Sequence, residues 1–121
     1  MSALLALAIA QLGQGDPNSN RRAAWFARSA LEDVVTELLQ AKGVDPGPLA
    51  SGRARLTCLE ALYREEDPGL ATRAEYAWAR LSGACHQHAY ELTPTHVEVL
   101  HLVELVSGLA ERASSPGIPA G

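Results

Sequence analysis

The residues best suited to act together chemically lie between positions 75 and 92, in EYAWARLSGACHQHAYEL. This stretch contains Arg80, His86, His88 and Tyr90. A histidine can act as a general base near neutral pH, and an arginine can stabilise the negative charge of a phosphorane-like transition state. These groups are the minimum for metal-independent cleavage of RNA through its 2′-hydroxyl. In that chemistry Arg80 would stabilise the charge, His86 or His88 would be the base, and Tyr90 would orient the histidine or the phosphate.

The spacing of these residues limits how they can meet. On a straight helix Arg80 and His86 lie about 9 Å apart along the axis and about 240° apart around it. They share a site only if the helix bends, if the side chains reach around it, or if a second copy of the chain contributes one of them. Gly83 lies between them and is a weak helix former, so it offers a place for a bend.

Metal chemistry and nucleophilic catalysis find no support in the sequence. His86 and His88 are two positions apart, which turns them about 200° from each other on a helix, so they cannot chelate one ion together. There is no zinc signature, no glycine-rich phosphate loop and no Gly-x-Ser-x-Gly turn. His101, on the last predicted helix, is interpreted as an ordinary surface histidine. We therefore expect no metal and no other cofactor.

Each candidate residue also has a purely structural interpretation. Arg80 can pair with an acidic neighbour on its own helix or face solvent. His88 falls on an apolar stripe and can be a hydrogen-bonded core histidine, and Tyr90 can cap the core with its hydroxyl in water. His86 lies on a more polar flank and is the more accessible of the two histidines.

One long helix must position these residues. Asp67 is its predicted N-cap and Pro68 lies in its first turn; it ends before Pro94, because proline disfavours helical geometry in the preceding residue. The prediction depends on residues that recur at steps of three and four, the period of one helix face. They are Leu70, Ala74, Ala77, Trp78, Leu81, Ala84, Cys85 and His88.

The rest of the chain is also predicted to be helical. Ala and Leu dominate, and Val and Ile never alternate as strands require, so the composition predicts an all-α protein. We expect a compact helical bundle of four longer helices plus a short N-terminal helix, forming a single domain over residues 1–113. Residues 114–121, rich in Ser, Pro and Gly, form a predicted disordered tail. The other helices are expected at about residues 2–12, 17–42, 51–64 and 97–113.

The sequence allows further predictions for two of these helices. The second begins at Asp16-Pro17, ends at Lys42-Gly43 and has a broad apolar stripe that includes Trp25. The first, with five large apolar residues and almost no polar face, must be covered on most sides. It is either a packing helix of its own bundle or a dimerisation arm.

Charge and cysteine content narrow the functional classes. The net charge of −4 argues against a broad nucleic-acid-binding surface, although basic residues gather in the first half of the chain. Cys58 and Cys85 are interpreted as buried reduced thiols, with a disulfide between them as the alternative. The N-terminal apolar run is shorter than a typical signal peptide or membrane span. We expect a cytoplasmic protein that does not enter a membrane. Candidate contacts to the RNA backbone are Arg21, Arg22, Arg53 and Arg55.

The central motif resembles that of the HEPN family, small helical bundles whose nuclease members carry an Arg, a short gap and a His that often continues as His-x-Tyr. Arg80 and His86 fit the gap, but His88 stands where the Tyr would follow. His88-Ala89-Tyr90 fits His-x-Tyr, but Arg80 is then one turn too early. Leu81 replaces the polar residue that often follows the Arg.

The resemblance extends to the helix pattern of roughly residues 17–113. It implies a homodimer in which the motif helices of two subunits face each other across a cleft. It also implies a role in RNA-directed defence, toxin or stress biology, either as a metal-independent endoribonuclease or as a degenerate member that binds RNA without cutting. The alternative is a non-enzymatic helical dimerisation or protein-interaction module that uses the apolar N-terminal helix and the acidic last helix.

Overall fold

The long helix α2 is the element against which the rest of the molecule packs. The computed structural model describes residues 3–85 and 94–114, which form five helices and, within those ranges, no strand. The predicted all-α bundle is confirmed. The helices are α1 (Ala3–Leu12), α2 (Pro17–Ala41), α3 (Gly52–Tyr63), α4 (Leu70–Cys85) and α5 (His96–Ser114).

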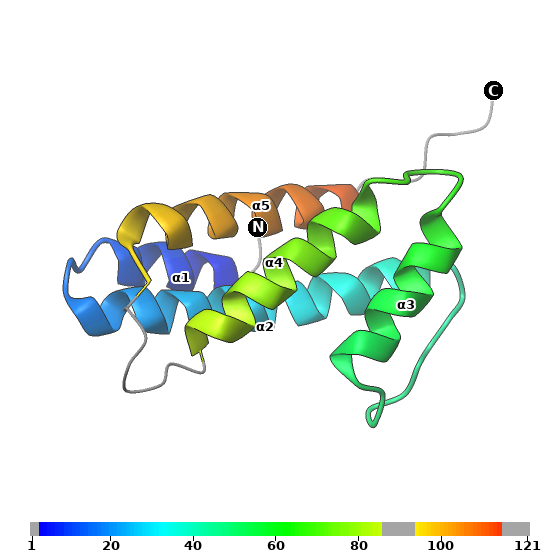
Figure 1. Ribbon diagram of the computed structural model, residues 1–121, viewed down its shortest axis with the longest axis horizontal. Helices are drawn as coiled ribbons and strands as arrows, with labels where there is room; N and C mark the ends of the chain where they lie inside the picture. Colours follow the sequence, from blue (N-terminus) through cyan, green and yellow to red (C-terminus); the bar gives the residue numbers. More distant parts are fainter. Residues whose placement is uncertain (1–2, 86–93, 115–121) are drawn as a thin grey trace.

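Figure 1 shows how the helices surround α2. α5 runs along its length, α1 lies against both helices near one end, α4 crosses at an angle, and α3 lies at the other end. α4 is in contact with α2, α3 and α5, so it has a neighbour on each of its flanks. This arrangement decides which residues can meet the candidate residues of α4.

The ends of α2 follow from its sequence as predicted. The side chain of Asp16 caps the helix by accepting a hydrogen bond from the Ser19 backbone N–H at 2.7 Å. At the other end Lys42 is the C-cap, and Gly43 has a positive φ of 75° that a residue with a side chain rarely adopts. The chain can therefore turn sharply after Ala41.

The start of α4 differs from the prediction. The helix begins at Leu70 rather than Pro68, and the carboxylate of Asp67, the predicted N-cap, lies 3.5 Å from guanidinium nitrogens of both Arg73 and Arg112. The acid is held by these two cations, which explains why it is not at a helix N-cap. The predicted continuation of this helix to residue 92 lies outside the described residues beyond Cys85.

The core is a single cluster to which all five helices contribute. Most of its residues are leucines and valines, and Ala23, Ala24, Ala27 and Ala30 of α2 are also buried in it. Tyr63 is buried at the end of α3, and its hydroxyl donates a hydrogen bond of 2.7 Å to the Leu38 carbonyl of α2. The largest fully buried apolar side chains are Leu5, Leu31, Leu38, Leu39, Leu59, Leu70, Leu81, Val99, Val106 and Leu109.

Three further expectations can be compared with the structure. Trp25 was predicted to be part of the apolar stripe of α2 but is 55% exposed, because the small residues Ala23, Ala24 and Ala27 occupy the buried face there. Cys58 is a half-buried free thiol, so it forms no disulfide. The predicted tail begins at Ser114, which is the last residue of α5; residues 115–121 lie outside the described residues.

Ion pairs connect the ends of α2, α3 and α5, which lie close together. The carboxylate of Glu66 lies 2.5 Å from Lys42 Nζ and 2.5 Å from a guanidinium nitrogen of Arg112. The same two cations lie over the ring of Tyr63, at 4.9 and 5.6 Å from its centroid. We call these four residues the Glu66 cluster; it lies away from the candidate residues of α4 and its role is structural.

Candidate functional site

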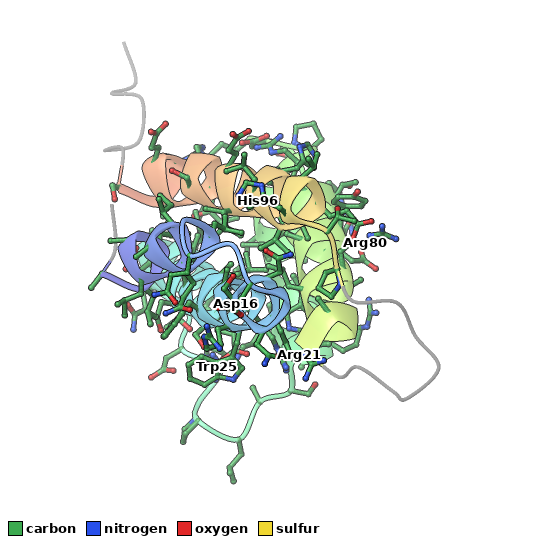
Figure 2. The ribbon with its side chains drawn as sticks, turned by 90° about the vertical axis from the view of Figure 1, so that its left-hand side faces the viewer. Asp16, Arg21, Trp25, Arg80 and His96 are labelled. Atoms are coloured by element: carbon green, nitrogen blue, oxygen red, sulfur yellow. The ribbon has the colours of Figure 1, made fainter. Side chains whose placement is uncertain are left out.

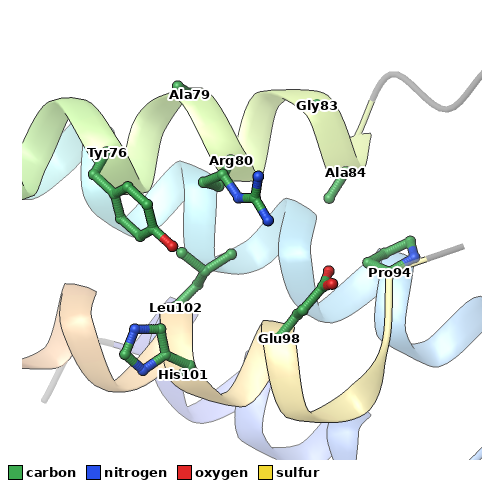
Figure 3. A pocket seen from close by; sticks show the side chains of 9 residues that line it. All are labelled: Tyr76, Ala79, Arg80, Gly83, Ala84, Pro94, Glu98, His101 and Leu102. Carbon is green, nitrogen blue, oxygen red and sulfur yellow. The ribbon is translucent and has the colours of Figure 1, made fainter.

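Arg80 lies in an open groove between α4 and α5, which we call the Arg80 groove. Its volume is about 280 Å³, and Figure 3 shows its lining. Two short polar stripes face each other across it, one from each helix. The lining residues are Tyr76, Ala79, Arg80, Gly83 and Ala84 of α4 with Pro94, Glu98, His101 and Leu102.

The period of α4 places these residues on one side. Ala77 and Leu81 are buried in the core, so the positions between them turn outward. Tyr76, Arg80 and Gly83 follow each other at steps of four and three and form one exposed stripe. Because the other α4 residues that line the groove, Ala79, Gly83 and Ala84, are small, the side chains of Tyr76 and Arg80 have room to reach toward α5.

The opposite wall is built by the first turns of α5. Thr95 caps this helix, since its hydroxyl oxygen accepts a hydrogen bond from the Glu98 backbone N–H at 3.1 Å. Val99 is buried, which turns Glu98 and His101 outward. In Figure 3 the carboxylate of Glu98 points up toward α4 and the guanidinium of Arg80 points down toward α5.

Within the described residues, no ion pair neutralises the charge of Arg80. No hydrogen bond or ion pair joins it to another residue in the described part of the chain, and Glu98 stays beyond ion-pair distance. Arg53, Arg64 and Arg112, by contrast, each lie within 3.0 Å of a carboxylate oxygen. Arg80 is therefore available to an anionic ligand in the groove.

The groove brings together four kinds of functional group. Tyr76 is 48% exposed, and its hydroxyl points across the space between the helices in Figure 3. Glu98 and His101 supply two groups that can take up or release a proton, and Arg80 supplies a fixed positive charge. Such a set can bind a phosphate and move protons next to it.

The predicted catalytic residues are only partly described by the structure. Arg80 is exposed in the groove, whereas His86, His88 and Tyr90 lie outside the described residues. Ala84 and Pro94, which flank that segment in the sequence, both line the groove. Tyr76, Glu98 and His101 were not predicted as site residues, because nothing in their spacing along the sequence indicates that α5 packs beside α4.

The four predicted RNA-contacting arginines occupy two separate places. Arg21 and Arg22 are exposed near the start of α2, where Arg22 pairs with Asp16 at 3.4 Å. Arg53 and Arg55 belong to α3, and Arg55 donates a hydrogen bond to Thr36 near the other end of α2. The two pairs are thus separated by roughly 20 Å along that helix.

The outer side of α2 carries a second aromatic feature. Trp25 packs edge-on against Phe26, with ring centroids 5.4 Å apart, and projects away from α5 (Figure 2).

The start of α2 is hydrogen-bonded to one end of the Arg80 groove. Asn20, next to Arg21, donates a hydrogen bond of 3.2 Å to the Pro94 carbonyl.

Two further classes of site were searched for in the described ranges. No group of three or more His, Cys, Asp or Glu residues there is arranged to hold a metal ion. No helix in the same ranges has the length and apolar character needed to cross a bilayer. Comparisons of the chain with protein-family models, with curated proteins and with solved structures give no match.

Proposed function

We propose that this chain is a HEPN-like, metal-independent endoribonuclease that acts on single-stranded RNA in the cytoplasm. The observation that carries the proposal is the guanidinium of Arg80, which forms no ion pair with any described residue, in a groove that also contains Tyr76, Glu98 and His101. Single-stranded RNA is the expected substrate class because its phosphates and 2′-hydroxyls are accessible without a duplex.

The reaction needs no group beyond these side chains. One of Glu98 and His101 removes the proton from a ribose 2′-hydroxyl, and the resulting oxygen attacks the adjacent phosphorus. The bond from phosphorus to the 5′-oxygen breaks, and the other residue of the pair donates a proton to that leaving oxygen. The products are a 2′,3′-cyclic phosphate and a 5′-hydroxyl.

Arg80 and Tyr76 stabilise the negative charge that develops on the phosphate. The guanidinium binds the non-bridging oxygens and stabilises the extra negative charge of the transition state, and the phenol donates a hydrogen bond. The carboxylate of Glu98 makes the groove less positive, which suits a site for one phosphate rather than a long electrostatic track.

The experiment uses a labelled single-stranded RNA, incubated with the full chain in excess chelator. We expect fragments that end in a 2′,3′-cyclic phosphate and no cleavage of the all-2′-deoxy strand. Arg80→Ala should lower the rate by about 10²-fold to 10³-fold. Arg64→Ala is the matched control, because Arg64 is exposed and paired with Glu60. Equal rates for both variants would refute the proposal.

A second function, self-association through α1, is favoured by one specific observation. Leu7 and Ile9, which project from different sides of a helix that carries no charged residue, are 46% and 45% exposed, while Leu5 and Ala8 are fully buried. A second copy of the chain is the simplest partner for the exposed surface of α1, because two uncharged surfaces related by a twofold axis do not repel each other.

The oligomeric state and its response to substitutions in α1 test this second function. If α1 mediates a homodimer, the wild-type chain has twice the monomer mass by light scattering, and Leu7→Glu with Ile9→Glu restores the monomer mass. A monomeric wild-type chain at high micromolar concentration would eliminate this second function.

A further inference from the structure

A second cavity, on the other flank of α4, has the features of a binding site for a small anion. It lies where α2, α3 and α4 meet the loop before α3, and its volume is about 240 Å³. We call it the Trp78 pocket. Trp78 is two positions from both Tyr76 and Arg80 and therefore faces the opposite side of α4 from the Arg80 groove.

The charge in this pocket is positive. Arg28, Arg55 and Glu32 are its ionisable lining residues. Arg28 pairs with Glu32, Nε to Oε1, at 3.4 Å, and that pair is neutral as a whole. No carboxylate in the described ranges lies within ion-pair distance of the Arg55 guanidinium. The pocket therefore retains one positive charge.

Arg55 is held in a fixed position. Its guanidinium donates one hydrogen bond to Thr36 Oγ1 at 3.0 Å and one to the Gly47 carbonyl at 3.1 Å. Both acceptors are neutral, and together they use two of the five N–H donors of the group. A half-buried, immobilised guanidinium with unused donors binds a phosphate with little further loss of side-chain entropy.

Trp78 gives the pocket an aromatic wall. Its indole is half-buried, and Gly52 packs against the side of the ring that includes Cζ2, Cε2 and Nε1. Trp78 is one of the residues that line the pocket. Ala50 adds an apolar surface beside it.

We infer that the Trp78 pocket binds a small phosphate-bearing molecule with a flat ring, of which a nucleoside 5′-monophosphate is the simplest. The phosphate contacts Arg55, and the ring packs on the indole wall. This site is separate from the Arg80 groove and does not depend on the ribonuclease proposal.

The test titrates the full chain with AMP, with inorganic phosphate and with adenosine by calorimetry. AMP is expected to bind at least about tenfold more tightly than either fragment, because only AMP offers both the anion and the ring. AMP affinity should fall as salt is added, since the anion contact is partly open to solvent. Adenosine binding as tightly as AMP would overturn the anion assignment, and phosphate binding as tightly would overturn the ring assignment.

Two variants and one spectroscopic readout complete the test. Arg55→Gln should weaken AMP binding by about tenfold or more, whereas Arg64→Gln, which removes the same charge from the exposed end of α3, should not change it. Because Arg55 also ties α3 to α2, the indole N–H resonances of the wild-type chain provide a readout without any variant in the pocket. AMP should shift the signal of Trp78 and not that of Trp25, assigned with Trp25→Phe; no shift at millimolar AMP would overturn the inference.

Discussion

The backbone of Gly52 packs so closely against Trp78 that a Cβ atom on Gly52 would lie 2.5 Å from Cζ2 of the indole. Real Cβ atoms do not approach other atoms so closely, so either the ring or the start of α3 would have to move. Gly52→Ala should therefore lower the free energy of unfolding by about 1–3 kcal/mol, the usual cost of overpacking. Urea denaturation measures this change, and the indole N–H resonance of Trp78 should move in the folded variant.

Gly108→Ala is the control for that variant. Gly108 lies inside α5 and is exposed, and apart from the backbone of its own helix its new Cβ would lie within 4 Å of no described atom. The same substitution there should raise the free energy of unfolding by about 0.5–1 kcal/mol, since alanine is the better helix former. If both substitutions stabilise the chain, the packing of Gly52 on Trp78 is not as close as the structure shows.

Tyr63→Phe tests the hydrogen bond between α3 and α2. The hydroxyl of Tyr63 is buried and donates to the Leu38 carbonyl, so its removal leaves that carbonyl without this donor. We expect the free energy of unfolding at pH 7 to fall by about 1–2 kcal/mol. The ring remains, and with it the contacts to Lys42 and Arg112.

The same variant also tests how the stability of the folded chain changes at alkaline pH. Burial raises the pKa of Tyr63 above its ordinary value. A raised folded-state pKa gives stability that is fully present below the unfolded-state pKa and is lost as pH rises through the folded one. The wild-type chain should therefore lose stability above about pH 10 more steeply than Tyr63→Phe. Parallel curves of melting temperature against pH would contradict this account.

Glu66 should make the chain sensitive to acid. Its hydrogen bond to Lys42, and then that to Arg112, lower the pKa of its carboxyl group. A lowered folded-state pKa gives stability that is present above the unfolded-state pKa and is lost as pH falls through the folded one. Glu66→Gln should thus lower the melting temperature at pH 7 and make little difference near pH 2. Glu65→Gln, a change of the same charge at an exposed neighbour, should have little effect at either pH.

The helices could be predicted from the sequence because their causes are local. The Asp16 cap, the Gly43 turn and the three-to-four residue period fix where α2 starts, ends and faces the core. One error arose within α2, where small alanines rather than Trp25 occupy the buried face. The other arose where a distant residue decides the outcome: Asp67 pairs with Arg112, 45 positions further along the chain.

The site was harder to predict for the same reason. Arg80 stood out because it lies near two histidines in the sequence, but the residues that share its groove in the described ranges come from α5. Neither periodicity nor spacing indicates which helix packs beside α4, so Glu98 and His101 looked like ordinary surface residues. The Trp78 pocket was missed because its lining comes from three helices and a loop.

If Glu98 and His101 act as one acid–base pair, their substitutions should not add. Glu98→Gln and His101→Asn each remove one of the two proton transfers of the same step, so each should lower the rate of RNA cleavage by about 10²-fold to 10⁴-fold. Once one transfer is lost, the other residue has less left to contribute, and the double variant should be about as slow as the slower single variant. Single-turnover cleavage in excess chelator measures all three rates. Effects that multiply fully would show that the two residues act independently, and unchanged rates would remove both from the mechanism.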